Sequence, residues 1–134
     1  MSQGALRPLT RKVVRLSPRR VLIVSEPGND RRALAIALRV QGHTAHEASD
    51  AREALALAPH CDFAIVDARL NDMEGVALAR ALEAQDGGMR VLLAVDAAFP
   101  SLARLPSELR RTQVMPKPLE AGALTEFLAA LPAH

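Results

Sequence analysis

The chain has 134 residues, of which 49% are hydrophobic, and its aromatic residues are three phenylalanines with no tyrosine or tryptophan. This length and composition predict one domain with a core of Ala, Leu, Val and Ile. The net charge is +2, and no apolar stretch approaches the roughly 20 residues that cross a bilayer. The N-terminus lacks the apolar segment of a secretory signal. A single cysteine, Cys61, excludes an internal disulfide and is compatible with a cytoplasmic location.

The basic residues are distributed unevenly along the chain. Residues 1–20 hold six of the 17 Lys and Arg and none of the 15 Asp and Glu. We therefore predict a basic N-terminal arm over residues 1–19 and a domain over residues 20–134. Such an arm is typical of segments that bind nucleic acid, anionic lipid or an acidic partner, but also of a solvated leader or a segment lying on the domain. The arm has no aromatic residue to stack on bases, which favours the second interpretation.

Short apolar runs alternate with helical patterns from residue 20 onward. Buried strands are predicted at 21–24, 43–47, 62–66, 91–95 and 113–115. Helices are predicted at 31–41, 50–57, 73–85 and 121–131. The turn at 27–30 offers N-cap chemistry for the first helix, Gly42 is its expected C′ glycine, and Ser49 or Asp50 caps the second helix. Residues 97–112 contain two prolines, so any helix there is short or kinked.

This alternation predicts a parallel five-stranded sheet covered by helices on both faces. Right-handed crossovers leave few topologies for such a sheet. The carboxyl ends of its strands meet along one edge, and in open α/β folds that edge carries the functional residues.

Three charged residues follow three of the predicted strands. Glu26 follows the run at 21–24, Asp67 ends the run at 62–66, and Lys117 follows the run at 113–115. Two carboxylates that come close together are stabilised by a cation, and hard oxygen ligands of this kind suit Mg²⁺. Lys117 would add a point charge for phosphoryl oxygens. The pattern indicates a metal-assisted phosphoryl site on Asp67, although each residue alone is also typical of an ordinary polar strand end.

The chain from about residue 20 to its end resembles the receiver domain of two-component response regulators. Four segments carry the resemblance, namely Val21–Glu26, Asp62–Asp67, Met73–Gly75 and Lys117–Leu119. It implies a flavodoxin-like (βα)5 three-layer sandwich with strand order 2-1-3-4-5. It also implies that Asp67 accepts a phosphoryl group from a phosphohistidine of a histidine kinase or phosphotransfer protein.

The resemblance further assigns individual roles at this edge. It implies that Glu26, Asp67 and the backbone carbonyl of Arg69 hold Mg²⁺, and that Lys117 contacts the acyl phosphate. It also implies a cis peptide bond between Lys117 and Pro118.

The chain departs from the receiver pattern at the metal site and at the switch. Receivers usually carry two acids after the first strand, and the first of these is Ser25 here. Serine adds no charge, so we expect Mg²⁺ binding to be weaker by about 1–3 kcal/mol. Receivers also place a Ser or Thr after the fourth strand, and here this switch position holds either Val95 or Asp96, neither with a hydroxyl. The aromatic residue that many receivers place three residues before the lysine is Val114.

Other reactive residues offer weaker candidates for a site. Arg69 could screen a phosphate at the mouth of the site or could be an ordinary loop arginine. Cys61 is expected to be a small residue in or at the edge of the core. The four histidines have no zinc-ligand spacing with it, and no glycine-rich phosphate loop is present.

Three functional hypotheses follow from these patterns. The first is a single-domain response regulator that accepts phosphate on Asp67, signals by binding a downstream protein, and has no enzymatic activity beyond its own phosphotransfer and autodephosphorylation. The second is a degenerate receiver that acts as a phosphorylation-independent interaction or dimerisation module. The third is a small α/β enzyme or a nucleic-acid binder that works through the basic arm. A homodimer is left open, and no membrane span is expected.

Overall fold

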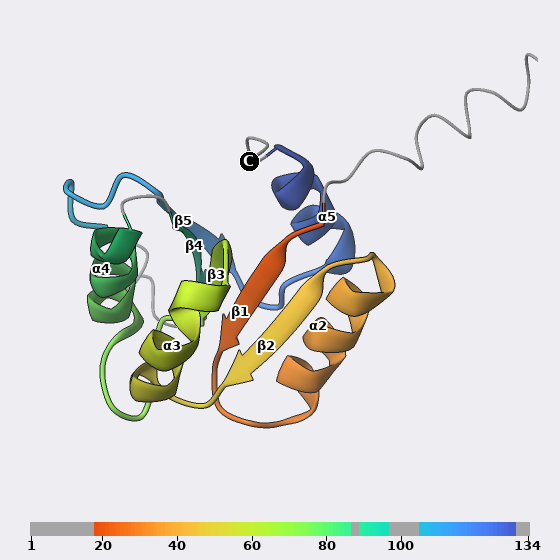
Figure 1. The fold of residues 1–134 in the computed structure, drawn as a ribbon, viewed down its shortest axis with the longest axis horizontal. Coiled ribbons are helices and arrows are strands. Elements are labelled where there is room, and N and C mark those ends of the chain that lie inside the picture. The colour runs from red at the N-terminus through yellow and green to blue at the C-terminus, as the bar shows by residue number, and fades with distance from the viewer. Residues whose placement is uncertain (1–17, 87–88, 97–104, 131–134) are drawn as a thin grey trace, which may run out of the picture.

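A computed structural model describes residues 18–86, 89–96 and 105–130 of the chain (Figure 1). The predicted arm lies almost entirely outside these residues. No helix within the described ranges is long and apolar enough to cross a membrane.

Five parallel strands form one sheet in the order β2-β1-β3-β4-β5, which is the order expected from the sequence. The strands are β1 (Arg20–Val24), β2 (Thr44–Ala48), β3 (Phe63–Asp67), β4 (Arg90–Val95) and β5 (Thr112–Pro116). The centre of the sheet is buried on both faces, which explains why β1, β3 and β4 read as continuous apolar runs.

Helices cover both faces of the sheet and make a three-layer sandwich. The helices are α2 (Asn29–Val40), α3 (Ala51–Leu57), α4 (Gly75–Asp86) and α5 (Ala121–Ala130), with a 3₁₀ turn at Ala58–His60. Figure 1 shows α3 and α4 on one side of the sheet and α2 and α5 on the other. The predicted three-layer α/β architecture is therefore confirmed.

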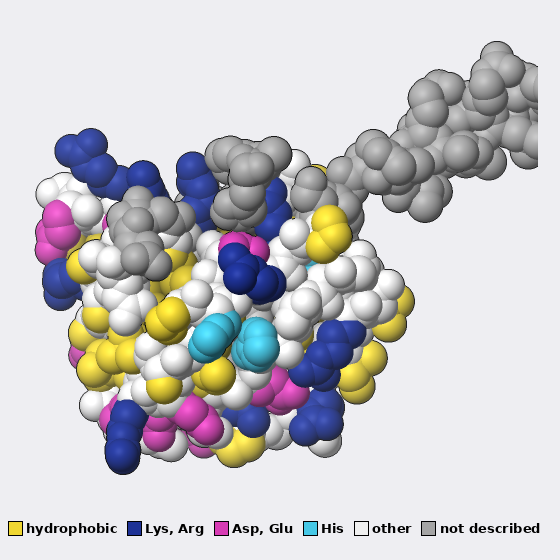
Figure 2. Space-filling view, in the orientation of Figure 1, with side chains coloured by type: hydrophobic (Ala, Val, Ile, Leu, Met, Phe, Trp, Pro, Cys, Tyr) yellow, Lys and Arg dark blue, Asp and Glu magenta, His cyan; other side chains and the backbone are white. Residues whose placement is uncertain are grey.

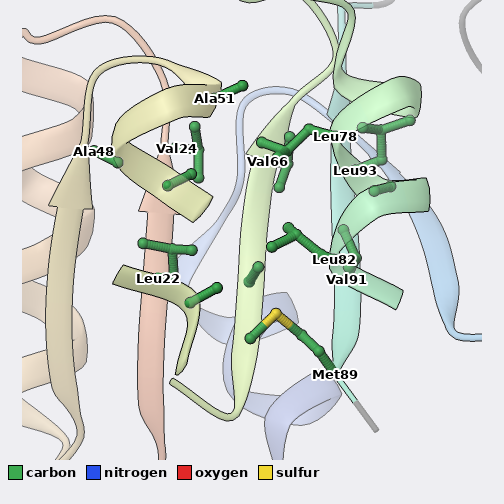
Figure 3. Close-up of a cluster of buried hydrophobic side chains, with 14 of the residues drawn as sticks. Leu22, Val24, Ala48, Ala51, Val66, Leu78, Leu82, Met89, Val91 and Leu93 are labelled. Carbon is green, nitrogen blue, oxygen red and sulfur yellow. The ribbon is translucent and has the colours of Figure 1, made fainter. Parts of the chain in front are cut away.

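Alternate strand residues enter two separate cores. The α3/α4 cluster, seen in Figure 3, takes Leu22 and Val24 of β1 together with alanines of α3 and leucines of α4. The α2/α5 cluster takes Val21 and Ile23, with Phe63 stacked at a tilt on Phe127 at 5.5 Å between ring centroids. Small side chains on α3 let this helix lie close to the sheet, so the scarcity of aromatic residues is compatible with a filled core.

Two local details differ from the sequence expectation. The N-cap of α2 is Gly28, and no side chain of the turn at 27–30 makes a capping hydrogen bond there. Between β4 and β5, residues 105–111 form turns and bends without a helix, and the remainder of the region where a short helix was considered falls outside the described residues. Gly42 ends α2 with φ of 97°, as predicted for a C′ glycine, and Asp50 caps α3 by accepting from the Glu53 N–H.

A buried histidine holds the amino-terminal ends of β1 and β2 together, at the edge of the sheet opposite the candidate site. His43 Nδ1 accepts a hydrogen bond from the Arg19 backbone N–H at 3.0 Å, and the Arg19 carbonyl accepts from the Thr44 N–H at 2.9 Å. Both Arg19 and His43 are buried. Because Nδ1 acts as an acceptor, this contact requires the neutral imidazole.

The fold is expected to lose stability in mild acid through His43. Burial, and secondarily the charge of Arg19, lower the pKa of His43 below its usual 6.5. The unfolded chain therefore takes up a proton at a higher pH than the folded chain does. The stabilising contribution of neutral His43 is complete above about pH 6.5, and it is lost as the pH falls toward the pKa of His43 in the folded state. Urea unfolding followed by circular dichroism from pH 8 to pH 5 measures this slope.

The variant His43→Gln should flatten that slope, because glutamine can accept the same hydrogen bond without titrating. The exposed His60, replaced by Gln, serves as the matched control and should leave the slope in place. If the slope were equal in the wild type and His43→Gln, another group would be responsible for it.

Candidate functional site

Two of the three predicted charged residues meet directly at the carboxyl edge. Asp67 is the last residue of β3, and Lys117 follows β5 immediately. Lys117 Nζ donates to Asp67 Oδ2 at 3.0 Å, and the side chains are 38% and 20% exposed, respectively. The contact joins residues 50 positions apart, and the Lys117–Pro118 bond is cis as the resemblance implies. The pair is accessible to a solute from outside.

Backbone contacts hold Asp67 and the loop after it in place. The Arg69 N–H donates to Asp67 Oδ1 at 3.1 Å, and Ala68 N–H donates to the Ala94 carbonyl at 2.9 Å. The Gly75 N–H returns to the Ala68 carbonyl at 2.8 Å, and Arg69 forms an isolated antiparallel bridge with Glu74. The loop thus folds back on the start of α4 and presents the Asp67 carboxylate outward.

Gly75 is packed directly behind Asp67. A Cβ at this position would overlap the Asp67 carbonyl oxygen and would lie 2.8 Å from Ala68 Cα and 2.9 Å from Leu93 Cδ1. Only glycine fits there without a shift of backbone. The glycine in the motif Met73–Gly75 therefore has a steric function at the site.

Ser25 and Glu26 reach the same edge from β1. Val24 is in register with Val66, so the next residues along the two strands, Ser25 and Asp67, are neighbours. Glu26 follows and is exposed. Figure 2 shows acidic side chains along the lower edge of the view, where β1 and β2 end in Figure 1, with Lys and Arg side chains among them. The edge therefore carries both signs of charge.

Comparisons with solved structures place this architecture among receiver domains. A response regulator receiver domain from Clostridium thermocellum superposes with a TM-score of 0.75 at 18% identity, covering 82% of this chain and 90% of that one. The chemotaxis response regulator CheY4 of Vibrio cholerae gives 0.73 at 24% identity, covering 84% and 97%. The receiver domain of the hybrid histidine kinase CckA gives 0.67 at 24%, covering 81% and 94%. The chain has the receiver fold. No protein-family model and no curated protein matches its sequence.

Within this receiver fold, the predicted metal ligands are all oxygen donors. They are the carboxylates of Glu26 and Asp67 and the backbone carbonyl of Arg69. The described ranges hold no group of three or more acidic, histidine or cysteine side chains that could enclose a metal ion. Position 25 holds a serine, which contributes no carboxylate to this edge. A hard donor set with few protein ligands fits Mg²⁺, which retains several waters in such sites.

The two candidates for the switch position differ in their surroundings. Val95 ends β4, is 4% exposed and packs in the α3/α4 cluster, and its carbonyl accepts from the Lys117 N–H at 2.8 Å. Asp96 is exposed at the end of the described segment. Val114 of β5 packs against the α3/α4 cluster. Val95 and Val114 are thus aliphatic side chains against the α3/α4 cluster, and neither offers a hydroxyl or an aromatic ring.

Sequence reasoning missed three polar residues that hold the loops of this receiver fold. Asp72 accepts from the Ala51 and Arg52 N–H groups, and the Ala51 bond in particular lowers the pKa of Asp72. Glu83 of α4 accepts from the chain just before β5, and Arg31 of α2 binds the ends of β1 and β2. Each lies in a helix or loop among other charged residues, and its hydrogen-bond partners are backbone groups distant in the sequence, which no sequence pattern indicates. Cys61 is buried as expected, and burial raises the pKa of its thiol to about 11.

Proposed function

We propose that this chain is a response regulator that accepts a phosphoryl group on Asp67 from a histidine kinase or phosphotransfer protein. The observation that carries the proposal is the 3.0 Å contact between Lys117 Nζ and Asp67 Oδ2 at the carboxyl edge of a receiver fold. Phosphoryl transfer depends mainly on positioning and charge neutralisation, and this pair offers an oriented carboxylate beside a cation. Its location is proposed to be the cytoplasm.

In the proposed transfer, an Asp67 carboxylate oxygen bonds to the phosphorus of a phosphohistidine. The phosphorus–nitrogen bond breaks, and the histidine nitrogen keeps the electron pair and takes up a proton. Lys117 Nζ, which contacts the free carboxylate of Asp67, then contacts the phosphoryl oxygens instead. Mg²⁺, held by Glu26, Asp67 and the Arg69 carbonyl, would neutralise charge on the phosphoryl group. Beyond this transfer and hydrolysis of the acyl phosphate, no enzymatic activity is proposed.

Acetyl phosphate with Mg²⁺ is expected to add the mass of one phosphoryl group to the intact protein. The variant Asp67→Asn should abolish the increase, because an amide cannot form the acyl phosphate. The variant Asp30→Asn, at an exposed acid in the first turn of α2, is the control and should be labelled like the wild type. Absence of labelling by acetyl phosphate and by histidine-kinase preparations would overturn the proposal.

A second candidate function is an interaction or dimerisation module that does not need phosphorylation. Ser25 in place of an acid, and the aliphatic surroundings of Val95 and Val114, favour it. If this function is correct, Asp67→Asn should keep the cellular activity of the wild type and the same sedimentation behaviour. Loss of activity in a folded Asp67→Asn protein would exclude it. Binding of nucleic acid through residues 1–19 is a third proposal, testable by its salt dependence.

A further inference from the structure

One arginine connects the ends of two strands at the candidate site. Arg31 lies in the first turns of α2, and its Nη1 donates to the Ser25 carbonyl at 2.9 Å, to the Ala48 carbonyl at 3.0 Å and to Ser49 Oγ at 3.2 Å. Ser25 also donates its N–H to the Ala48 carbonyl. The guanidinium therefore fastens the residue after β1 and the last residue of β2 to each other and to the start of α2.

The charge of Arg31 is compensated within the same cluster. Its Nε donates to Glu47 Oε1 at 2.9 Å, and the two side chains are only 12% and 13% exposed. Glu47 is also approached by Arg32 at 3.3 Å and by Arg39 at 3.8 Å. A side chain so enclosed is directed toward the backbone and toward Glu47. It acts on a solute at the site only through the residues that it holds.

The residue held most directly is the one before Glu26. A hydrogen bond to the Ser25 carbonyl sets the plane of the Ser25–Glu26 peptide, from which the Glu26 side chain begins. Serine at position 25 leaves Glu26 as the acid that β1 contributes, so its orientation matters more than in a site with two acids. Outer residues that orient a metal ligand typically change metal affinity by roughly 10- to 100-fold when they are removed.

We propose that Arg31 is a positioning residue for the metal site, fixing the Ser25–Glu26 turn so that Glu26 can bind Mg²⁺ together with Asp67. This inference rests on the proposed function, because it assumes that the edge takes Mg²⁺. The guanidinium of Arg31 is directed to Glu47 and to the Ser25 carbonyl, so its effect on the site is exerted through the residues that it holds.

The test compares Arg31→Met with Arg39→Met in the full chain. Arg39 lies on the same helix, contacts the same Glu47 and donates to the Ala45 carbonyl at 2.8 Å, but it lies away from the strand ends. Mg²⁺ affinity is measured by titration followed through backbone amide NMR signals, which reads binding without any reaction. Labelling by acetyl phosphate is then measured as a function of Mg²⁺ concentration.

Arg31→Met is expected to weaken Mg²⁺ binding about ten-fold, and labelling should recover at high Mg²⁺. Arg39→Met should bind like the wild type. Arg31→Lys keeps the charge but not the planar fork, and it should lie closer to Arg31→Met than to the wild type. If Arg31→Met does not fold, Arg31→Lys alone decides.

Equal Mg²⁺ affinities in the Arg31 and Arg39 variants would overturn the inference while leaving the proposed function intact. A wild type that binds no Mg²⁺ and takes no label would overturn both. Reduced labelling at every Mg²⁺ concentration with unchanged affinity would also overturn the positioning role, since it would indicate a general structural effect.

Discussion

Alanine in place of Gly75 is expected to destabilise the fold by roughly 3 kcal/mol and to displace Asp67, the proposed phosphoryl acceptor. The added Cβ would overlap the Asp67 carbonyl oxygen and press on Ala68 Cα, both of which are backbone atoms. Neither can rotate away as the end of a flexible side chain could. The strand end must move, and the contact between Asp67 and Lys117 should lengthen with it.

Urea unfolding by circular dichroism measures the stability of this variant, and the rate of labelling by acetyl phosphate measures the effect on the site. Gly122→Ala is the matched control, because nothing lies within 4 Å of a Cβ at that helical position. It should leave stability unchanged or raise it by up to about 1 kcal/mol. The close packing behind Asp67 would be contradicted if both variants unfolded at the same urea concentration.

Glutamine in place of Glu83 is expected to cost roughly 2–3 kcal/mol of stability. Glu83 Oε1 accepts from the Arg110 N–H at 3.1 Å, and Oε2 accepts from the Arg111 N–H at 3.0 Å and from Thr112 Oγ1 at 2.6 Å. The carboxylate thereby ties α4 to the start of β5. An amide would turn a donor toward groups that already donate, and Thr112 is buried.

The control for this prediction is Glu108→Gln. This variant removes an exposed carboxylate between β4 and β5 that pairs with Arg80 of α4. Exposed ion pairs contribute little, so this variant should unfold close to the wild type. Chemical denaturation of both proteins gives the comparison. A small loss for Glu83→Gln, equal to that of the control, would show that the three hydrogen bonds are replaced readily by water.

The sheet could be predicted because burial on both faces leaves a plain signal. Runs such as Val21–Val24 and Val91–Val95 have no polar alternation, and such short runs alternating with helical patterns are typical of parallel strands covered on both faces. The burial pattern left several strand orders open. The order implied by the receiver resemblance brought the ends of the strands before Asp67 and Lys117 close together, and the structure has that order. The first and last residues of β2 and β5 were harder to predict, because these two strands lie at the sheet edges and carry polar residues.

The contacts of long polar side chains were beyond sequence reasoning. Arg31 and Arg32 are adjacent and chemically identical. Arg31 is enclosed and binds the backbone carbonyls of Ser25 and Ala48, whereas Arg32 is mostly exposed. The difference arises because successive residues of a helix point in different directions, so the Arg31 side chain faces the end of β2 while most of the Arg32 side chain faces solvent. The absence of a side-chain cap on α2 was equally hidden, because Asn29 and Asp30 are good capping residues that the chain places inside the helix.

The aliphatic core has a consequence for how such a chain changes over evolutionary time. Alanine, valine, leucine and isoleucine exchange with little loss when total volume is kept, whereas an aromatic ring demands a fitted neighbour. With Phe63 and Phe127 as the one ring contact among the described residues, most of the interior can drift from one aliphatic residue to another. Divergence of this kind lowers sequence identity while the backbone fold is kept.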